Sequence, residues 1–211
     1  MTADVMYPDE QENQQFPLRK IDNEQGNEKP IPGDIAIWVL IFAELFEFGM
    51  LFILYIIAKV YEPELFRTGP LSLNTISGIC NTLILLTSSY FVARAVRAIR
   101  LDQIPQSKKW LWLTFLSGVA YCLVKAYEYN FNAQNGIDVE TNLFFSVYYY
   151  LTFNHLLHVG FGMSGLLWVL FRHYNGAYTA ENYHGLESAA CYWHMVDLAW
   201  IIIFPLIYVI R

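Results

Sequence analysis

Acidic and imidazole side chains stand inside the apolar stretch that closes the chain, residues 187–211. This stretch is long enough to cross a bilayer as one helix, because about 20 apolar residues rising 1.5 Å each match the hydrocarbon thickness. At about 100° per residue, Glu187, His194 and Asp197 fall within a quarter turn of one another. Ionisable groups at that depth normally face protein, so we expect this stripe to contact other helices as part of a buried polar layer.

Two histidines, His155 and His158, lie three residues apart in the preceding apolar stretch. That spacing can put two imidazoles on one metal ion or on a haem. A zinc or di-iron centre would also need carboxylates, and Glu44, Glu47 or Asp197 can serve only where their helices converge. Because buried polar groups are usually hydrogen-bonded to one another, we expect both histidines to join the polar layer and predict no metal site.

A pair of acidic residues, Glu44 and Glu47, lies near the middle of the first apolar stretch, one helical turn apart. No basic residue lies within the same predicted span. Burial away from water disfavours the charged form of both carboxyl groups. A role in proton transfer and a neutral, merely packed acid are therefore both open for this pair.

Five apolar stretches of spanning length organise the chain, which is 55% hydrophobic and only 15% charged. We predict an all-α, polytopic membrane protein with a single bundle of five transmembrane helices. The predicted spans cover residues 34–58, 73–98, 110–131, 142–171 and 187–210. Asp34 is the expected N-cap of the first span, and Pro205 is expected to kink the last. Residues 1–32 are polar with scattered charge, and we expect a disordered cytoplasmic tail there, before a membrane domain of residues 33–211.

Other side chains are expected to hold the helices together. Lys125 and Glu128 lie three residues apart on one span and can form an ion pair. Trp193 and Trp200 lie seven apart on one face, and we expect them to pack against a neighbouring helix or subunit. Small residues that allow close helix approach are concentrated in the second and fourth spans. They are Asn81, Thr82, Thr87, Ser88 and Ser89, which favour a central second span, and Gly160, Gly162, Ser164 and Gly165.

Basic residues are concentrated in the connection between the second and third spans. They are Arg94, Arg97, Arg100, Lys108 and Lys109. Because cytoplasmic loops carry an excess of Lys and Arg, this pattern predicts a cytoplasmic N-terminus and a periplasmic C-terminus.

Several well-known chemical motifs are absent from the sequence. It has no Walker loop, no glycine-rich dinucleotide turn, no Cys-x-x-Cys-His haem attachment motif and no nucleophile elbow. Its three cysteines are isolated within apolar runs, and no broad basic surface is available for nucleic acid. We therefore expect no redox chemistry from this chain unaided.

Four stretches, in order along the chain, resemble subunit III of the haem-copper oxidases, also called cytochrome c oxidase subunit 3. The strongest is Tyr-Trp-His-Met-Val-Asp at 192–197, followed by Trp200, which resembles the usual Tyr-Trp-His-Phe-Val-Asp. Phe-Asn-His-Leu-Leu-His-Val at 153–159 resembles Gly-Phe-His-Gly-Leu-His-Val. Ala-Tyr-Glu-Tyr at 126–129 is similar to Ser-Glu-Tyr, and Ile-Phe-Ala-Glu at 41–44 to Ile-Ser-Glu. The resemblance covers the whole membrane region.

The resemblance implies a non-catalytic subunit that carries no haem or copper and packs against the catalytic subunit I, which holds haem and, in oxidases, copper. It places the chain in the bacterial inner membrane, in a respiratory electron transport complex. In this family Glu44 matches a buried, carbodiimide-reactive carboxyl, and phospholipids occupy a cleft between helix groups. The resemblance also implies that the subunit supports assembly, stability and proton uptake of its catalytic partner.

Two departures from the family pattern bear on the assignment. Many members have seven spans, whereas this chain shows five, and Glu47 stands where the family has an apolar or aromatic residue. Five spans and the run from Asn81 to Ser89 most resemble the NorE branch, which accompanies bacterial nitric oxide reductases in denitrification. Five-span subunits of oxygen-reducing oxidases, in aerobic respiration, stay open as well. Outside the family, the alternatives are a stand-alone membrane metalloenzyme and a small proton-coupled transporter using Glu44 and Glu47.

Overall fold

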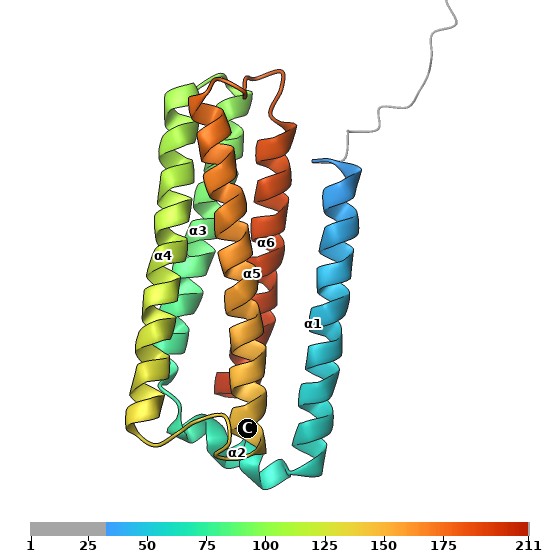
Figure 1. Ribbon diagram of the computed structural model, residues 1–211, viewed down its shortest axis with the longest axis vertical. Coiled ribbons are helices and arrows are strands. Elements are labelled where there is room, and N and C mark those ends of the chain that lie inside the picture. The colour runs from blue at the N-terminus through green and yellow to red at the C-terminus, as the bar shows by residue number, and fades with distance from the viewer. Residues whose placement is uncertain (1–32, 211) are drawn as a thin grey trace, which may run out of the picture. The chain divides into compact units, whose positions relative to one another are not determined.

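The computed structural model describes residues 33–210, and these form an all-helical bundle (Figure 1). Its elements are α1 (Ile35–Tyr61), α2 (Pro63–Ser72), α3 (Thr75–Arg100), α4 (Ile104–Gln134), α5 (Leu143–Tyr174), α6 (His184–Phe204) and a closing π-helical turn, η1 (Pro205–Val209). Five helices, the last being α6 with η1, are long and apolar enough to cross a membrane. The predicted all-α, five-span fold is confirmed, and the predicted tail at 1–32 lies outside the described residues.

Several helix ends differ from the predicted spans. Helix α4 begins at Ile104 rather than Trp110, because Pro105 is suited to the first turn of a helix and the basic residues after it continue the helix beyond the apolar core. The short helix α2 was not predicted. It begins with Pro63 at its first position and lies across the end of the bundle, where it buries Phe66.

Helix α6 is the most buried span and packs against α3, α5 and α1, whereas α3, which its small polar residues predicted to be central, packs mainly against α4 and α6. The Trp193 indole donates to the Ser88 hydroxyl at 2.8 Å, and the Trp200 indole donates to Thr82 at 3.0 Å. A Cβ added at Gly118 of α4 or Gly162 of α5 would approach Trp193 to 3.0 Å. Both tryptophans are fully buried, so they pack against helices of this chain.

The other small residues of α5 point away from the bundle. A Cβ added at Gly160 or Gly165 would meet nothing within 4 Å, and Ser164 is bonded only within its own helix, to the Gly160 carbonyl. Among the small residues of α5, only Gly162 therefore shows the expected close packing within the described chain.

Helix α1 is the least buried span and is hydrogen-bonded to the other helices at three heights. At its start the Gly33 amide donates to the Glu187 carboxylate at 3.2 Å, and the Asp34 amide donates to Ser188 at 3.1 Å. The Asp34 side chain makes no cap hydrogen bond, so the expected side-chain cap is not formed. Glu44 and Glu47, near the middle of α1, contact α5, and Tyr55, near its far end, contacts η1.

The last helix ends differently from the simple kink predicted at Pro205. Because proline has no amide proton, the helix cannot continue its regular hydrogen bonding there, and a π-helical turn follows. The Ile210 amide donates to the Pro205 carbonyl at 2.8 Å, five residues back. The Leu206 carbonyl accepts a hydrogen bond from the Tyr55 hydroxyl of α1, which provides the third attachment point of that helix.

Candidate functional site

Four polar side chains meet between α1 and α5, and we call them the lateral cluster: Glu44, Glu47, Asn154 and His158. The His158 Nε2 atom lies 2.6 Å from Glu44 Oε2, and the Asn154 side-chain amide donates to Glu47 Oε1 at 2.9 Å. Both pairs lie about one turn apart on their helices, so each helix presents its two residues on the same face. The sequence placed these residues on two helices, and the structure brings the two faces together.

The geometry of His158 determines how many protons the Glu44–His158 pair holds. Its Nδ1 atom lies 2.8 Å from the Asn154 carbonyl oxygen, which can only accept, so Nδ1 carries a hydrogen. The contact between Nε2 and Glu44 then needs one further proton, either on the imidazole or on the carboxyl group. The pair therefore holds a single proton between its two basic atoms.

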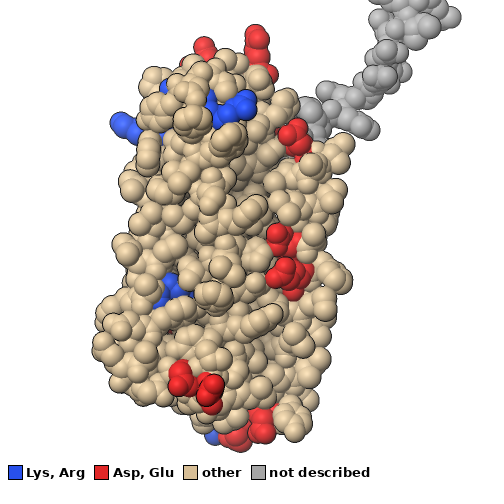
Figure 2. Space-filling model, in the orientation of Figure 1, with Lys and Arg blue, Asp and Glu red and all other residues tan. Residues whose placement is uncertain are grey.

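The lateral cluster opens on the side of the bundle. The side chains of His158 and Glu44 are 12% and 16% exposed, and Glu47 is exposed. Figure 2 shows acidic side chains half-way along the bundle, over α1. Ligand atoms of Glu44, Glu47 and His158 lie within 4.8 Å of one another, so these three residues could hold a metal ion in principle. The absence of a metal remains a prediction.

His155 does not belong to the lateral cluster. Its ring is fully buried, with centroids 5.2 Å from Trp200, 5.7 Å from Tyr121 and 6.2 Å from Phe48. Neither ring nitrogen has a hydrogen-bond partner among the described residues. The two histidines therefore occupy different environments, and of the two only His158 has a carboxylate partner among residues 33–210.

The ionisable stripe of α6 divides into two sites, with Glu187 at the end of the bundle and His194 and Asp197 beside Ser89. Glu187 forms an ion pair with Arg100 at the basic-loop end of α3, and His194 Nδ1 lies 2.7 Å from the Ser89 hydroxyl. Asp197 is buried near Ser89, but neither carboxylate oxygen has a hydrogen-bond partner among the described residues. The stripe faces the bundle as expected, but the described residues do not form one continuous polar layer.

A second polar group, which we call the buried cluster, comprises Lys125, Glu128, Tyr148 and Tyr208. Lys125 Nζ lies 3.2 Å from Glu128 Oε2, and the Tyr148 and Tyr208 hydroxyls donate to Oε1 of the same carboxylate at 2.7 and 2.5 Å. Lys125 also donates to Tyr208 at 3.0 Å. The predicted ion pair is present. Sequence reasoning did not link the two tyrosines to it, because they come from α5 and η1.

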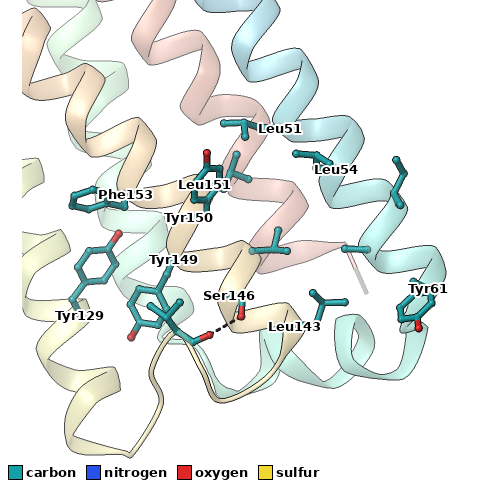
Figure 3. A pocket seen from close by; sticks show the side chains of 14 residues that line it. Leu51, Leu54, Tyr61, Tyr129, Leu143, Ser146, Tyr149, Tyr150, Leu151 and Phe153 are labelled. Carbon is teal, nitrogen blue, oxygen red and sulfur yellow. Dashed lines mark hydrogen bonds between the residues drawn. The ribbon is translucent and has the colours of Figure 1, made fainter.

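An apolar groove lies beside α5 toward the α2 end of the bundle, with a volume of about 870 Å³ (Figure 3). Leu51, Leu54, Tyr149, Tyr150 and Phe153 are among its lining residues. The Ser146 hydroxyl donates to the Val139 carbonyl at 2.6 Å, so this polar group of the wall already has a partner. The groove can therefore accept hydrocarbon.

The fold and these sites describe a polytopic membrane bundle in which several ionisable side chains pair within the chain. Residues 33–210 match the family model described as cytochrome c oxidase subunit III, so the chain belongs to this family. The resemblance drawn from the four motifs is confirmed.

Individual relatives carry the same family name. The chain is 32% identical over 177 residues to the cytochrome c oxidase subunit 3 of Thermostichus vulcanus, a match covering 83% of this chain and 86% of the relative. It is 35% identical over 176 residues to that of Synechocystis sp., covering 83% and 74%. A probable cytochrome c oxidase subunit 3 of Mycobacterium bovis is 30% identical over 182 residues, covering 85% and 90%.

Proposed function

We propose that this chain is the non-catalytic subunit III of a bacterial haem-copper oxidase superfamily complex in the respiratory electron transport chain. It supports the assembly, stability and proton uptake of the catalytic subunit I. The observation that carries this proposal is the family match over residues 33–210, the entire described bundle. Haem and copper belong to the partner subunits. The same match disfavours a stand-alone metalloenzyme or a transporter.

The lateral cluster supports the part of the proposal that concerns protons. The Glu44–His158 pair holds one proton between two basic atoms and is partly open at the side of the bundle. A sealed, neutral acid could not exchange its proton, whereas this pair can do so once a hydrated partner surface lies against it. Proton exchange with the catalytic partner is therefore favoured over packing alone for Glu44.

The location and orientation follow from charge and from contacts at one end of the bundle. The basic residues between α3 and α4 lie at the same end as the start of α1, because Glu187 contacts both Arg100 and the Gly33 amide. An excess of basic residues marks the cytoplasmic side of a bacterial inner membrane. We therefore place the N-terminus in the cytoplasm and the C-terminus in the periplasm.

The apolar groove beside α5 supports a role for phospholipid. Its lining residues include leucines of α1 and aromatic side chains of α5. In a bilayer such a surface is covered by acyl chains or by another protein. We place a phospholipid chain in this groove, as a lipid contact of the subunit.

Two branches of the superfamily remain as candidates for the partner. The relatives described above are named cytochrome c oxidase subunit 3, which favours an oxygen-reducing complex and aerobic respiration. The five spans and the polar run of α3 favour the NorE branch, associated with nitric oxide reductase and denitrification. The redox subunit that accompanies the chain decides between them.

Purification from the native membrane tests this proposal. The tagged chain is extracted in a mild detergent, and the co-purifying proteins are identified by an optical spectrum and mass spectrometry. We expect haem absorbance together with a catalytic subunit I, and a copper-bearing or a cytochrome c type subunit that names the branch. A strain carrying the untagged chain controls for non-specific capture. A colourless protein isolated alone, also after cross-linking in the membrane, would contradict the proposal.

A further inference from the structure

Glu47 is exposed in the middle of a membrane-spanning helix. It lies twelve residues after Ile35 and fourteen before Tyr61, the ends of α1. Among the described residues it is the one exposed acidic or basic side chain that lies away from the ends of the spanning helices. Ionisable side chains at this depth normally face protein or a water-filled cavity, because hydrocarbon offers no hydrogen-bond donors.

The chain itself satisfies only part of this carboxyl group. Among the described residues, Asn154 alone donates a hydrogen bond to Glu47, at 2.9 Å and to one oxygen. A carboxylate accepts about four hydrogen bonds, so most of its capacity is left for a group outside the chain. The Tyr192 hydroxyl, buried without a hydrogen-bond partner among the described residues, lies within electrostatic reach of Glu44 and Glu47. This part of the bundle therefore lacks polar partners.

The outer surface of α5 leaves room for close approach of another helix. Gly160 has open space where a Cβ would stand, and the exposed Ser164 lies one turn further along the same face. Small residues of this kind let helix backbones approach closely in membranes. Since no other helix of the described bundle fills the space at Gly160, this surface is available to a separate chain.

We propose that the face of α1 and α5 around Glu47 and Gly160 receives a transmembrane helix of the catalytic partner, which presents a hydrogen-bond donor to Glu47 at mid-membrane. The donor is a basic or amide side chain, since an acidic group needs a complementary partner. The apolar exposed side chains around Glu47, such as Phe46 and Leu157, pack against the same helix. This inference rests on the proposed function and deepens it, by naming the face and the chemistry of the contact.

Site-specific photo-cross-linking in the native complex tests which face is covered. A photoreactive residue replaces Leu157, on the proposed face, or Leu123, an exposed residue of α4. We expect position 157 to cross-link to one transmembrane segment of the catalytic subunit that carries a donor side chain. Position 123 is expected to give little of this product. Equal cross-linking from both positions, or a second copy of this chain captured at position 157, would overturn the inference.

Substitutions test the contact itself. Gly160→Leu fills the open space without a clash inside the chain, and Ala126→Leu is the matched change at an exposed small residue of α4. We expect Glu47→Leu to lower the yield of co-purifying catalytic subunit about tenfold, as for the loss of one charged hydrogen bond. Gly160→Leu is expected to lower it as well, because the added side chain keeps the partner helix at a distance. Ala126→Leu is expected to leave it unchanged. Unfolding of the isolated variants in detergent confirms that the chain still folds.

Three results separate the inference from its alternatives. Wild-type co-purification from both Glu47→Leu and Gly160→Leu would show that this face meets lipid and would overturn the inference. A stoichiometric metal ion in the purified complex, lost in Glu47→Gln, would assign the cluster to a metal and would also overturn it. A wild-type chain that brings down no haem protein, before or after cross-linking, would overturn the proposed function as well.

Discussion

The two glutamate clusters of this bundle have opposite surroundings. Glu128 of the buried cluster accepts from Lys125, Tyr148 and Tyr208, and its side chain is 0% exposed. Within the part of the chain that the structure describes, Glu47 of the lateral cluster accepts from Asn154 alone, and it is exposed. Both carboxyl groups belong to spanning helices, where water does not compensate for a missing partner.

The difference shows that the polar residues of one membrane chain can serve different purposes. The buried cluster has its hydrogen-bond partners within the chain, and we therefore assign it to holding α4, α5 and η1 together. The lateral cluster is incomplete, and we assign it to contact with another subunit. We therefore expect changes in the buried cluster to affect the folding of the chain, and changes in the lateral cluster to affect the complex.

The largest expected effect follows from breaking the buried ion pair. Lys125→Met leaves Glu128 without its cation in a fully buried site, and we expect a loss of about 3 to 5 kcal/mol in the free energy of unfolding. Denaturant unfolding in detergent measures it. The double variant Lys125→Met/Glu128→Gln should recover much of the loss, since no unpaired charge remains. A loss no greater than that of Lys109→Met, at an exposed position, would contradict this role.

A smaller effect on stability, with a larger one on function, is expected from Glu44→Gln. The glutamine amide can still donate to His158 Nε2, so α1 stays attached and the free energy of unfolding falls by about 1 kcal/mol. The single shared proton of the pair is lost. We expect the assembled complex to contain the variant in full amount but to turn over more slowly or to lose activity sooner.

Steady-state turnover and its decay over time measure this effect, with Glu62→Gln, an exposed acid at the end of α1, as the control. Unchanged turnover and durability of the Glu44→Gln complex would reduce the pair to a packing contact. Failure to assemble would instead place Glu44 with the groups that fold the chain.

The smallest effect is expected at the end of the bundle, from Glu187→Gln. The Arg100 side chain is 51% exposed, so solvent screens the ion pair and its loss should cost at most about 1 kcal/mol. The glutamine oxygen can still accept from the Gly33 amide. Unfolding at low and at high salt measures the effect. A loss that is large and independent of salt would show that this pair behaves like the buried cluster.

Much of the fold could be predicted from the sequence, because hydrophobic length alone identifies five spans. The ends were less predictable: α4 starts within a basic, proline-containing segment, and α2 is too short and too polar to resemble a span. The turn at Pro205 is attached to α1 by the hydrogen bond from Tyr55 to the Leu206 carbonyl, and these two residues are 151 positions apart. Local sequence does not contain that information.

The same limit applies to the sites. The Lys125–Glu128 pair was predictable because its partners lie three residues apart on one helix. Helical spacing also placed Glu187, His194 and Asp197 on one face. The partners of Glu187 and His194 come from the register of α6 against α3 and, for Glu187, also from the start of α1. The register of two helices depends on side-chain packing, such as the close contact of Trp193 with Gly118 and Gly162. The spacing of residues along one helix predicts the face on which each residue lies, whereas the packing of the helices determines which residues it contacts.

The contact between Glu44 and His158 also has a consequence for how the chain enters the membrane. His158 is translated 114 residues after Glu44, which at 5 to 20 residues per second is about 6 to 23 s later. Helix α1 is the most apolar of the five spans, with a mean hydropathy of 2.2, and it can leave the ribosome and insert by itself. During that interval both of its glutamates lie in the membrane without their hydrogen-bond partners on α5. The contact between α1 and α5 therefore forms late in biogenesis, after the intervening helices have been made.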